Sequence, residues 1–119
     1  MAEARLSLRV DLGTAHQGLR RLGPGKVALL EAIARDGSIS AAARSLGMSY
    51  RRAWELVEDL NTTFGAPVAA TATGGSKGGG ARLTPLGEAV VAGFRALEAA
   101  AAEAAAPHLA ALLERLPRG

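Results

Sequence analysis

Residues 38–52 read Ser-Ile-Ser-Ala-Ala-Ala-Arg-Ser-Leu-Gly-Met-Ser-Tyr-Arg-Arg, and this stretch decides the fold that we expect. Ser40 can cap a short helix over the alanines, and Gly47 can end that helix in the left-handed conformation. Ser49 can cap a second, longer helix. Because only two residues separate the helices, the connection suits a compact helix-turn-helix over residues 38–64.

The chain before this motif predicts one strand and one helix. Residues 5–12 alternate between polar and apolar side chains, which is typical of a half-buried strand. Residues 13–23 carry three glycines and no firm period, so we expect a loop or a short helical turn there. From Pro24, an acceptable first helical residue, apolar side chains recur at helical spacing until Gly37 supplies a stop.

A β-hairpin with a basic, glycine-rich tip is expected next. Residues 67–73 and 81–83 are strand candidates, separated by Gly-Gly-Ser-Lys-Gly-Gly-Gly at residues 74–80. The tip matches neither the G-x-x-x-x-G-K-[ST] nor the G-x-G-x-x-G nucleotide-binding pattern. It can be interpreted as a passive linker. It can also be a wing over residues 68–83, in which glycines let backbone amides approach phosphates.

A long C-terminal helix completes the predicted fold. Thr84 followed by Pro85 is a helix start. We expect the helix to run to about Ala106 and Pro107 to interrupt it before a last short helix. The whole chain, residues 1–119, is then a single winged helix-turn-helix domain, mostly α with a small β-sheet, with dimerisation helices over residues 85–116. The expected dimer contacts are Leu86, Val90, Phe94 and Leu97.

Composition excludes several classes of protein. Of the 119 residues, 49% are hydrophobic but only 3% are aromatic, so the core must be aliphatic. The absence of cysteine excludes disulfides and thiolate metal sites and suits a reducing cytoplasm. Neither a secretory signal nor a membrane-spanning run is visible. The histidines are isolated and no catalytic constellation stands out, so we expect a cytoplasmic protein without metal, cofactor or enzymatic activity.

The charge is distributed unevenly along the chain. Residues 1–83 hold 11 Lys/Arg against 7 Asp/Glu, a net +4, whereas residues 84–119 hold 3 against 4, a net −1. A basic front, residues 1–83, and a nearly neutral rear, residues 84–119, suit a DNA-facing half joined to an assembly half. Ordinary surface charge would account for the same numbers.

The first turns of the second helix carry side chains suited to base recognition. A recognition helix places such residues in the major groove, where arginine can pair with guanine and glutamate with the cytosine amino group. The alternative is a solvated basic face on an ordinary helix. Because these residues follow a short Ala-rich helix and a serine cap, we favour base recognition. We expect base contacts from Ser49, Tyr50, Arg51, Arg52 and Glu55, and backbone contacts from Ser40, Arg44, Gly75, Ser76, Lys77, Gly78 and Arg82.

Residues 27–64 resemble the helix-turn-helix of LysR-type regulators, in the run Gly37-Ser38-Ile39-Ser40-Ala41-Ala42-Ala43-Arg44-Ser45-Leu46. A closer resemblance, over most of residues 5–105, is to the DNA-binding domain of the ModE family of molybdate-responsive regulators. It rests on Gly37-Ser38-Ile39-Ser40, on Ser49-Tyr50-Arg51-Arg52-Ala53-Trp54 and on the unusual stretch from Ala72 to Thr84.

The ModE resemblance implies a winged-helix homodimer that binds double-stranded DNA and controls transcription, with a link to molybdate metabolism. It implies that residues 49–52 face the bases and that Lys77 and the neighbouring glycines contact the backbone. Members of the family that sense molybdate carry further β-barrel domains. No strand-rich segment follows Thr84, so we expect the DNA-binding half without molybdate sensing.

Two other hypotheses stay open. A winged helix can instead dock a protein partner, here through its Ala/Leu-rich rear. A small oxyanion-responsive protein is the other, with molybdate or a similar anion at the glycine-rich tip or the dimer interface. The basic front favours DNA over the protein-docking hypothesis.

Overall fold

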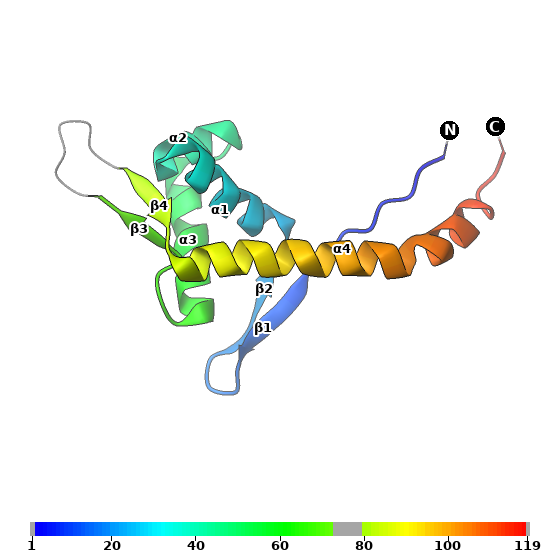
Figure 1. Ribbon diagram of the computed structural model, residues 1–119, viewed down its shortest axis with the longest axis horizontal. Helices are drawn as coiled ribbons and strands as arrows, with labels where there is room; N and C mark the ends of the chain where they lie inside the picture. Colours follow the sequence, from blue (N-terminus) through cyan, green and yellow to red (C-terminus); the bar gives the residue numbers. More distant parts are fainter. Residues whose placement is uncertain (1, 73–79, 119) are drawn as a thin grey trace.

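Three helices and two small hairpins surround one aliphatic core, and a fourth, long helix extends away from it. The structure is a computed structural model that describes residues 2–72 and 80–118 (Figure 1). The elements are β1 (Val10–Thr14), β2 (Gly18–Leu22), α1 (Pro24–Asp36), α2 (Ile39–Ser45), α3 (Tyr50–Phe64), β3 (Ala69–Thr71), β4 (Ala81–Leu83) and α4 (Pro85–Leu113). This arrangement confirms the predicted winged helix-turn-helix with a long C-terminal helix.

The core is aliphatic, as the composition predicted, except for Phe94. Helix α1 contributes most to it, since Val27, Leu29, Leu30, Ala32 and Ile33 are all fully buried. Burying a Val, Leu or Ile side chain contributes about 1.5–3 kcal/mol. Helix α1 is therefore the central element against which α2, α3, β4 and α4 pack.

Capping residues set the helix ends of the helix-turn-helix, and one of the predicted caps is wrong. Ser38, and not Ser40, caps α2, because the Ser38 hydroxyl accepts a hydrogen bond from the Ala41 backbone N–H at 2.9 Å. Ser49 caps α3 as predicted, accepting from the Arg52 N–H at 3.0 Å. Gly47 has the expected left-handed backbone, with φ of 68°.

The N-terminal region forms a hairpin that the sequence did not predict correctly. Strand β1 begins at Val10 and not at residue 5, and the predicted loop over residues 13–23 contains β2. The hairpin needs glycine at both ends of its turn. Gly18 has φ of 73°, and a Cβ on Gly13 would lie 1.9 Å from the Gly18 carbonyl oxygen. Residues 5–9 alternate in polarity but have no strand partner in the described part of the chain.

The second hairpin is the predicted wing. Strands β3 and β4 pair antiparallel, with Ala70 opposite Arg82. The hairpin is joined to the end of α1, because the Ala81 N–H donates to the Gly37 carbonyl at 2.8 Å. Four predicted backbone-contacting residues, Gly75, Ser76, Lys77 and Gly78, lie outside the described residues.

Helix α4 is continuous through Pro107, which corrects the prediction of two helices. The proline removes one backbone donor, but the surrounding Ala-rich sequence has high helix propensity and the chain continues helically. Figure 1 shows the last turns bending away from the axis of the earlier ones. Only the first part of α4 is packed against the core, through Gly87, Val90 and Phe94.

Candidate nucleic-acid interface

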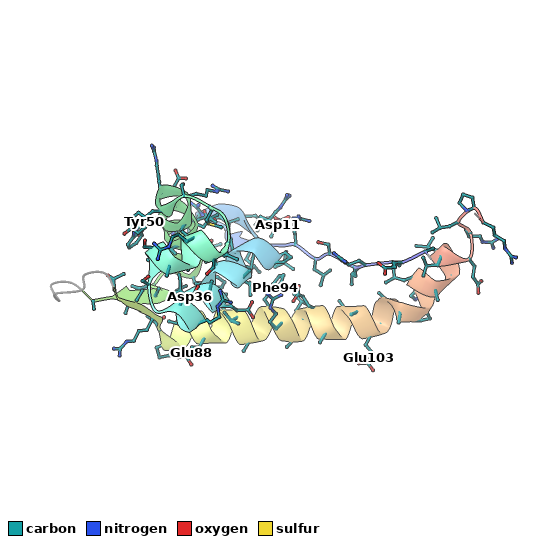
Figure 2. All side chains as sticks on the ribbon, turned by 90° about the horizontal axis from the view of Figure 1, so that it is seen from above. Asp11, Asp36, Tyr50, Glu88, Phe94 and Glu103 are labelled. Atoms are coloured by element: carbon teal, nitrogen blue, oxygen red, sulfur yellow. The ribbon has the colours of Figure 1, made fainter. Side chains whose placement is uncertain are left out.

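The first two turns of α3 present polar side chains to solvent. Arg51 is 91% exposed, and Arg52 and Glu55 are exposed by 61% and 55%. Tyr50 is also exposed, with its ring edge-on to Trp54 at 6.3 Å between centroids. Figure 2 shows Tyr50 on the opposite side of the molecule from the α4 residues Glu88 and Glu103. The N-terminal end of α3 is therefore free to enter a groove.

Glu55 lies between the two arginines without holding either tightly. Its carboxylate is 3.9 Å from Arg51 Nε and 3.9 Å from Arg52 Nη1. Exposed ion pairs of this kind contribute about 0–1 kcal/mol. Each guanidinium can therefore leave the carboxylate for a base or phosphate at little cost, and the cluster offers donors and an acceptor side by side.

Small residues bring α2 close to α3 and hold its orientation. Ala42 and Ala43 of α2 and Ala53 of α3 are buried. The Met48 N–H donates to the Ala43 carbonyl at 3.0 Å, which fixes the turn. Ser45 Oγ donates to Asp36 at 2.7 Å and so connects α2 to the end of α1. The sequence thus builds a rigid support behind the exposed turn.

The sequence interpretation missed a charged network that fixes the other side of α3. Asp59 accepts from Arg20 of β2 at 2.6 Å and from Lys26 of α1. Burial alone would raise the pKa of Asp59, but the hydrogen bonds from Lys26 and Arg20 outweigh it and hold the pKa below its usual range. The only sequence signal was an aspartate next to the apolar face of a helix, which does not reveal its partners.

The other predicted DNA-contacting residues occupy α2 and β4. Ser40 and Arg44 are exposed one turn apart on α2, and Arg44 donates to the Ser40 hydroxyl at 3.2 Å. Arg82 is exposed on β4. Figure 1 shows α2, α3 and β3–β4 gathered at the N-terminal end of α4.

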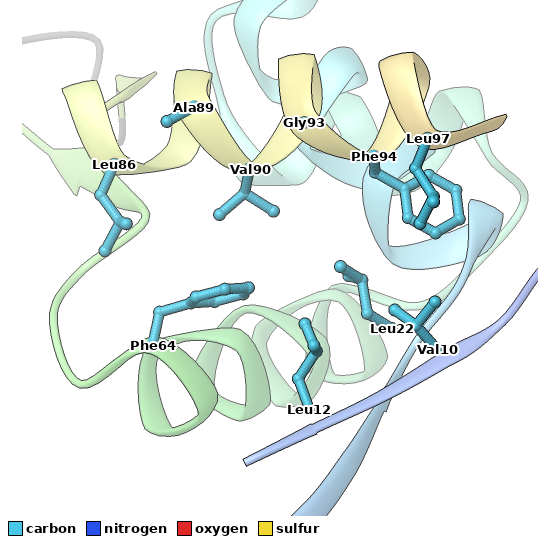
Figure 3. A pocket seen from close by; sticks show the side chains of 10 residues that line it. All are labelled: Val10, Leu12, Leu22, Phe64, Leu86, Ala89, Val90, Gly93, Phe94 and Leu97. Atoms are coloured by element: carbon cyan, nitrogen blue, oxygen red, sulfur yellow. The ribbon is translucent and has the colours of Figure 1, made fainter. Parts of the chain in front are cut away.

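The four predicted dimer residues lie along the first half of α4 but differ in exposure. Val90 and Phe94 are buried at 7% and 3% exposure within the protomer, whereas Leu97 is 41% exposed. All four border an apolar groove between α4, the β1–β2 hairpin and the end of α3 (Figure 3). Its other side is formed by Val10, Leu12, Leu22 and Phe64.

Residues 2–72 and 80–118 contain neither a membrane-spanning helix nor a cluster of metal ligands. No helix there is long and apolar enough to cross a membrane. No three His, Asp or Glu side chains in that part of the chain gather in a way that could hold a metal ion.

The helix-turn-helix α2–α3, with its exposed, serine-capped α3, and the two-stranded wing β3–β4 define a winged helix-turn-helix protein. The chain belongs to the lysR family of bacterial regulatory helix-turn-helix proteins, whose family pattern matches residues 25–88.

Sequence relatives support the narrower resemblance to ModE. The chain is 53% identical over 83 residues to the molybdenum-pterin-binding protein MopB of Rhodobacter capsulatus, which covers 70% of this chain and 31% of that protein. It is 42% identical over 95 residues to the molybdenum transport protein ModE of Azotobacter vinelandii, covering 80% and 33%. It is 40% identical over 68 residues to the DNA-binding transcriptional dual regulator ModE of Escherichia coli, covering 57% and 26%. The matched part of the chain thus spans between about a quarter and a third of the length of these relatives.

Proposed function

We propose that this chain is the DNA-binding part of a transcriptional regulator linked to molybdenum, and that it binds double-stranded DNA sequence-specifically. The observation that carries the proposal is the exposed start of α3, where Arg51, Arg52 and Glu55 are only loosely paired with one another on a well-packed support. The basic balance of residues 1–83 supports the same partner.

In the proposed complex, α3 enters the major groove. Arg51 and Arg52 donate to guanine, and Glu55 accepts from a cytosine amino group. Ser49 and Tyr50 lie at the same helix end. Contacts to the backbone come from Ser40 and Arg44 on α2 and from the wing, including Arg82 and the glycine-rich tip with Lys77.

The link to molybdenum rests on the relatives, two of which are molybdenum proteins by name and one a DNA-binding transcriptional regulator. We propose the same regulatory class for this chain, acting in the cytoplasm and without catalysis. Residues 1–119 form one winged-helix domain in this proposal, with α4 joining two copies. A dimer places its two recognition helices about 34 Å apart, one turn of DNA, so a palindromic site is expected.

The test compares affinity for duplexes selected from random DNA with affinity for unselected duplexes. Arg51→Ala should reduce the preference for selected sites by about 5- to 150-fold, because a lost bidentate contact removes about 1–3 kcal/mol of discrimination. Lys77→Ala should weaken binding to both kinds of duplex alike. Arg115→Ala, which removes an exposed arginine near the far end of the chain, is the matched control. Unchanged preference in Arg51→Ala would overturn the base-contact assignment, and absence of DNA binding by the unaltered chain would overturn the function.

A further inference from the structure

A second cationic surface lies beside α3, and apart from Arg52 its charged residues were not among those that the sequence singled out for DNA. It is a cleft of about 560 Å³ between the segment before β1, the end of β2, the start of α1 and the first turns of α3. Arg9, Arg21, Lys26 and Arg52 supply its charged lining, and Met48 of the helix-turn-helix borders it. Four cations, three from different elements and one from the segment before β1, thus line one cleft.

Two of these arginines are available to a ligand. Arg9 has no ion-pair partner within residues 2–72 and 80–118, and its stem rests on the backbone of Gly23, since a Cβ there would lie 3.1 Å from Arg9 Cγ. Arg21 Nε is 3.6 Å from Asp11, but the two side chains are 68% and 53% exposed. Such an exposed pair holds Arg21 only weakly.

Lys26 has a different role in the cleft. Its side chain is only 17% exposed and pairs with Asp59 of α3. It also donates to the Arg21 carbonyl at 2.7 Å. Lys26 therefore fixes the end of β2 against α3 and so fixes the position of Arg21 relative to the recognition helix.

The cleft opens on the same side of the molecule as the exposed start of α3. Figure 2 shows Asp11 and Tyr50 on the same side of the molecule, away from α4. Asp11 pairs with Arg21 in the β1–β2 register, and paired residues share one face of a sheet. Figure 1 shows the junction of β2 and α1 on the opposite side of α3 from the wing strands β3 and β4.

We propose that Arg9 and Arg21 bind phosphates of the DNA strand that borders the major groove on the side away from the wing. A helix in the major groove lies between two sugar-phosphate backbones, about 12 Å apart. The wing is placed to contact one of them and this cleft the other. Arg52, at the cleft edge, would connect the phosphate contacts with the base contacts. This inference rests on the proposed function and assigns to the N-terminal hairpin the task of fixing the register of α3 on DNA.

The experiment measures binding of the full chain to an unselected 20-base-pair duplex at several salt concentrations. Each neutralised phosphate contributes about −0.9 to the slope of log affinity against log salt. The variant Arg9→Ala/Arg21→Ala should therefore have a slope less steep by about 1.8 per bound protomer, or about 3.6 for the proposed dimer, with its ratio of selected to unselected affinity unchanged. The control Arg115→Ala/Arg118→Ala removes the same charge from exposed positions near the far end and should keep the slope of the unaltered chain.

A charge-conserving variant separates binding from folding. Arg9→Lys/Arg21→Lys should restore most of the slope, because a lysine still supplies a positive charge to a phosphate. An unchanged slope in the alanine pair, beside a steep slope in the unaltered chain, would overturn this inference and leave the proposed function standing. The same holds if the control pair flattens the slope as much. A flat slope in the unaltered chain would instead overturn the function itself.

Discussion

At the scale of single residues, Asp59 connects α3 to two other elements of the fold. It is 27% exposed and accepts from cations on β2 and on α1, so it joins the N-terminal hairpin and α1 to α3. Its pKa lies below its usual range because the hydrogen bonds from Lys26 and Arg20 outweigh the effect of burial. The charged form is therefore more stable in the folded protein than in the unfolded chain.

The first prediction is that Asp59→Asn lowers the free energy of unfolding by about 1–2 kcal/mol at pH 7, because charge-assisted hydrogen bonds are lost. A carboxylate with a lowered folded pKa stabilises above its unfolded pKa of about 3.9 and loses that effect as the pH falls through the folded value. The difference between variant and unaltered chain should therefore shrink below about pH 4. Urea unfolding at pH 7 and pH 3 measures it.

A matched control is available on β1. Asp11→Asn removes an aspartate that is 53% exposed and 3.6 Å from Arg21, and it should change stability by less than about 0.5 kcal/mol. An equal effect of Asp59→Asn at both pH values would show that its charge is not what stabilises the fold.

At the scale of elements, the start of α4 is fixed by an approach that only glycine permits. Thr84 caps α4 by accepting from the Gly87 N–H at 3.1 Å, and its own N–H donates to the Val68 carbonyl at 3.1 Å. A Cβ on Gly87 would lie 2.0 Å from that same carbonyl oxygen. The long helix therefore starts directly against the segment that leads into the wing.

The second prediction compares two glycines of the same helix. Gly87→Ala should destabilise the protein by about 1–3 kcal/mol, because the methyl group forces the backbone of residue 68 to move. Gly93→Ala should stabilise it by up to about 1 kcal/mol, since a Cβ there meets nothing within 4 Å and alanine is the better helix former. Thermal unfolding of both variants checks the sign of each effect. Equal shifts in the same direction would mean that the contact with Val68 does not limit the packing of α4.

At the scale of the whole molecule, α4 is much longer than the core that it packs against. Its 29 residues span about 43 Å at 1.5 Å per residue, and the molecule measures 59 × 37 × 21 Å. The apolar groove beside its first half stays open in a single copy, as Figure 3 shows. Both the length of α4 and its open apolar groove are explained by our proposal that two copies associate through this side of α4.

The third prediction tests that association. Leu97→Glu should weaken dimerisation at least tenfold, about 1.4 kcal/mol, because it places a charge at the edge of the apolar groove. Ala99→Glu adds the same charge on another face of α4, where Ala99 is exposed, and should leave the dimer intact. Sedimentation equilibrium over a range of concentrations gives the dimer dissociation constant of each variant and of the unaltered chain. A monomeric unaltered chain, or equal effects of the two variants, would contradict the proposed interface.

Local signals in the sequence determined most of the helix ends and the exposed part of the candidate site. Ser49, Thr84 and Gly37 act on backbone groups within three or four residues, so their roles follow from sequence alone. The exposure of Arg51 follows from the apolar periodicity of α3 in the same way. These features depend on neighbouring residues along the chain, so they would be expected in any fold that contains the same helices.

Tertiary structure alone decided the features that depend on distant partners. Strand β2 exists because it pairs with β1, and its own sequence has no clear alternation. Asp59 finds its cations 33 and 39 residues away, and no spacing rule indicates them. Arg9 and Arg52 meet at one cleft only because the hairpin is fixed against α3. Short-range hydrogen bonds can be recognised in a sequence because chain geometry fixes their spacing, whereas these long-range contacts depend on how the whole chain packs.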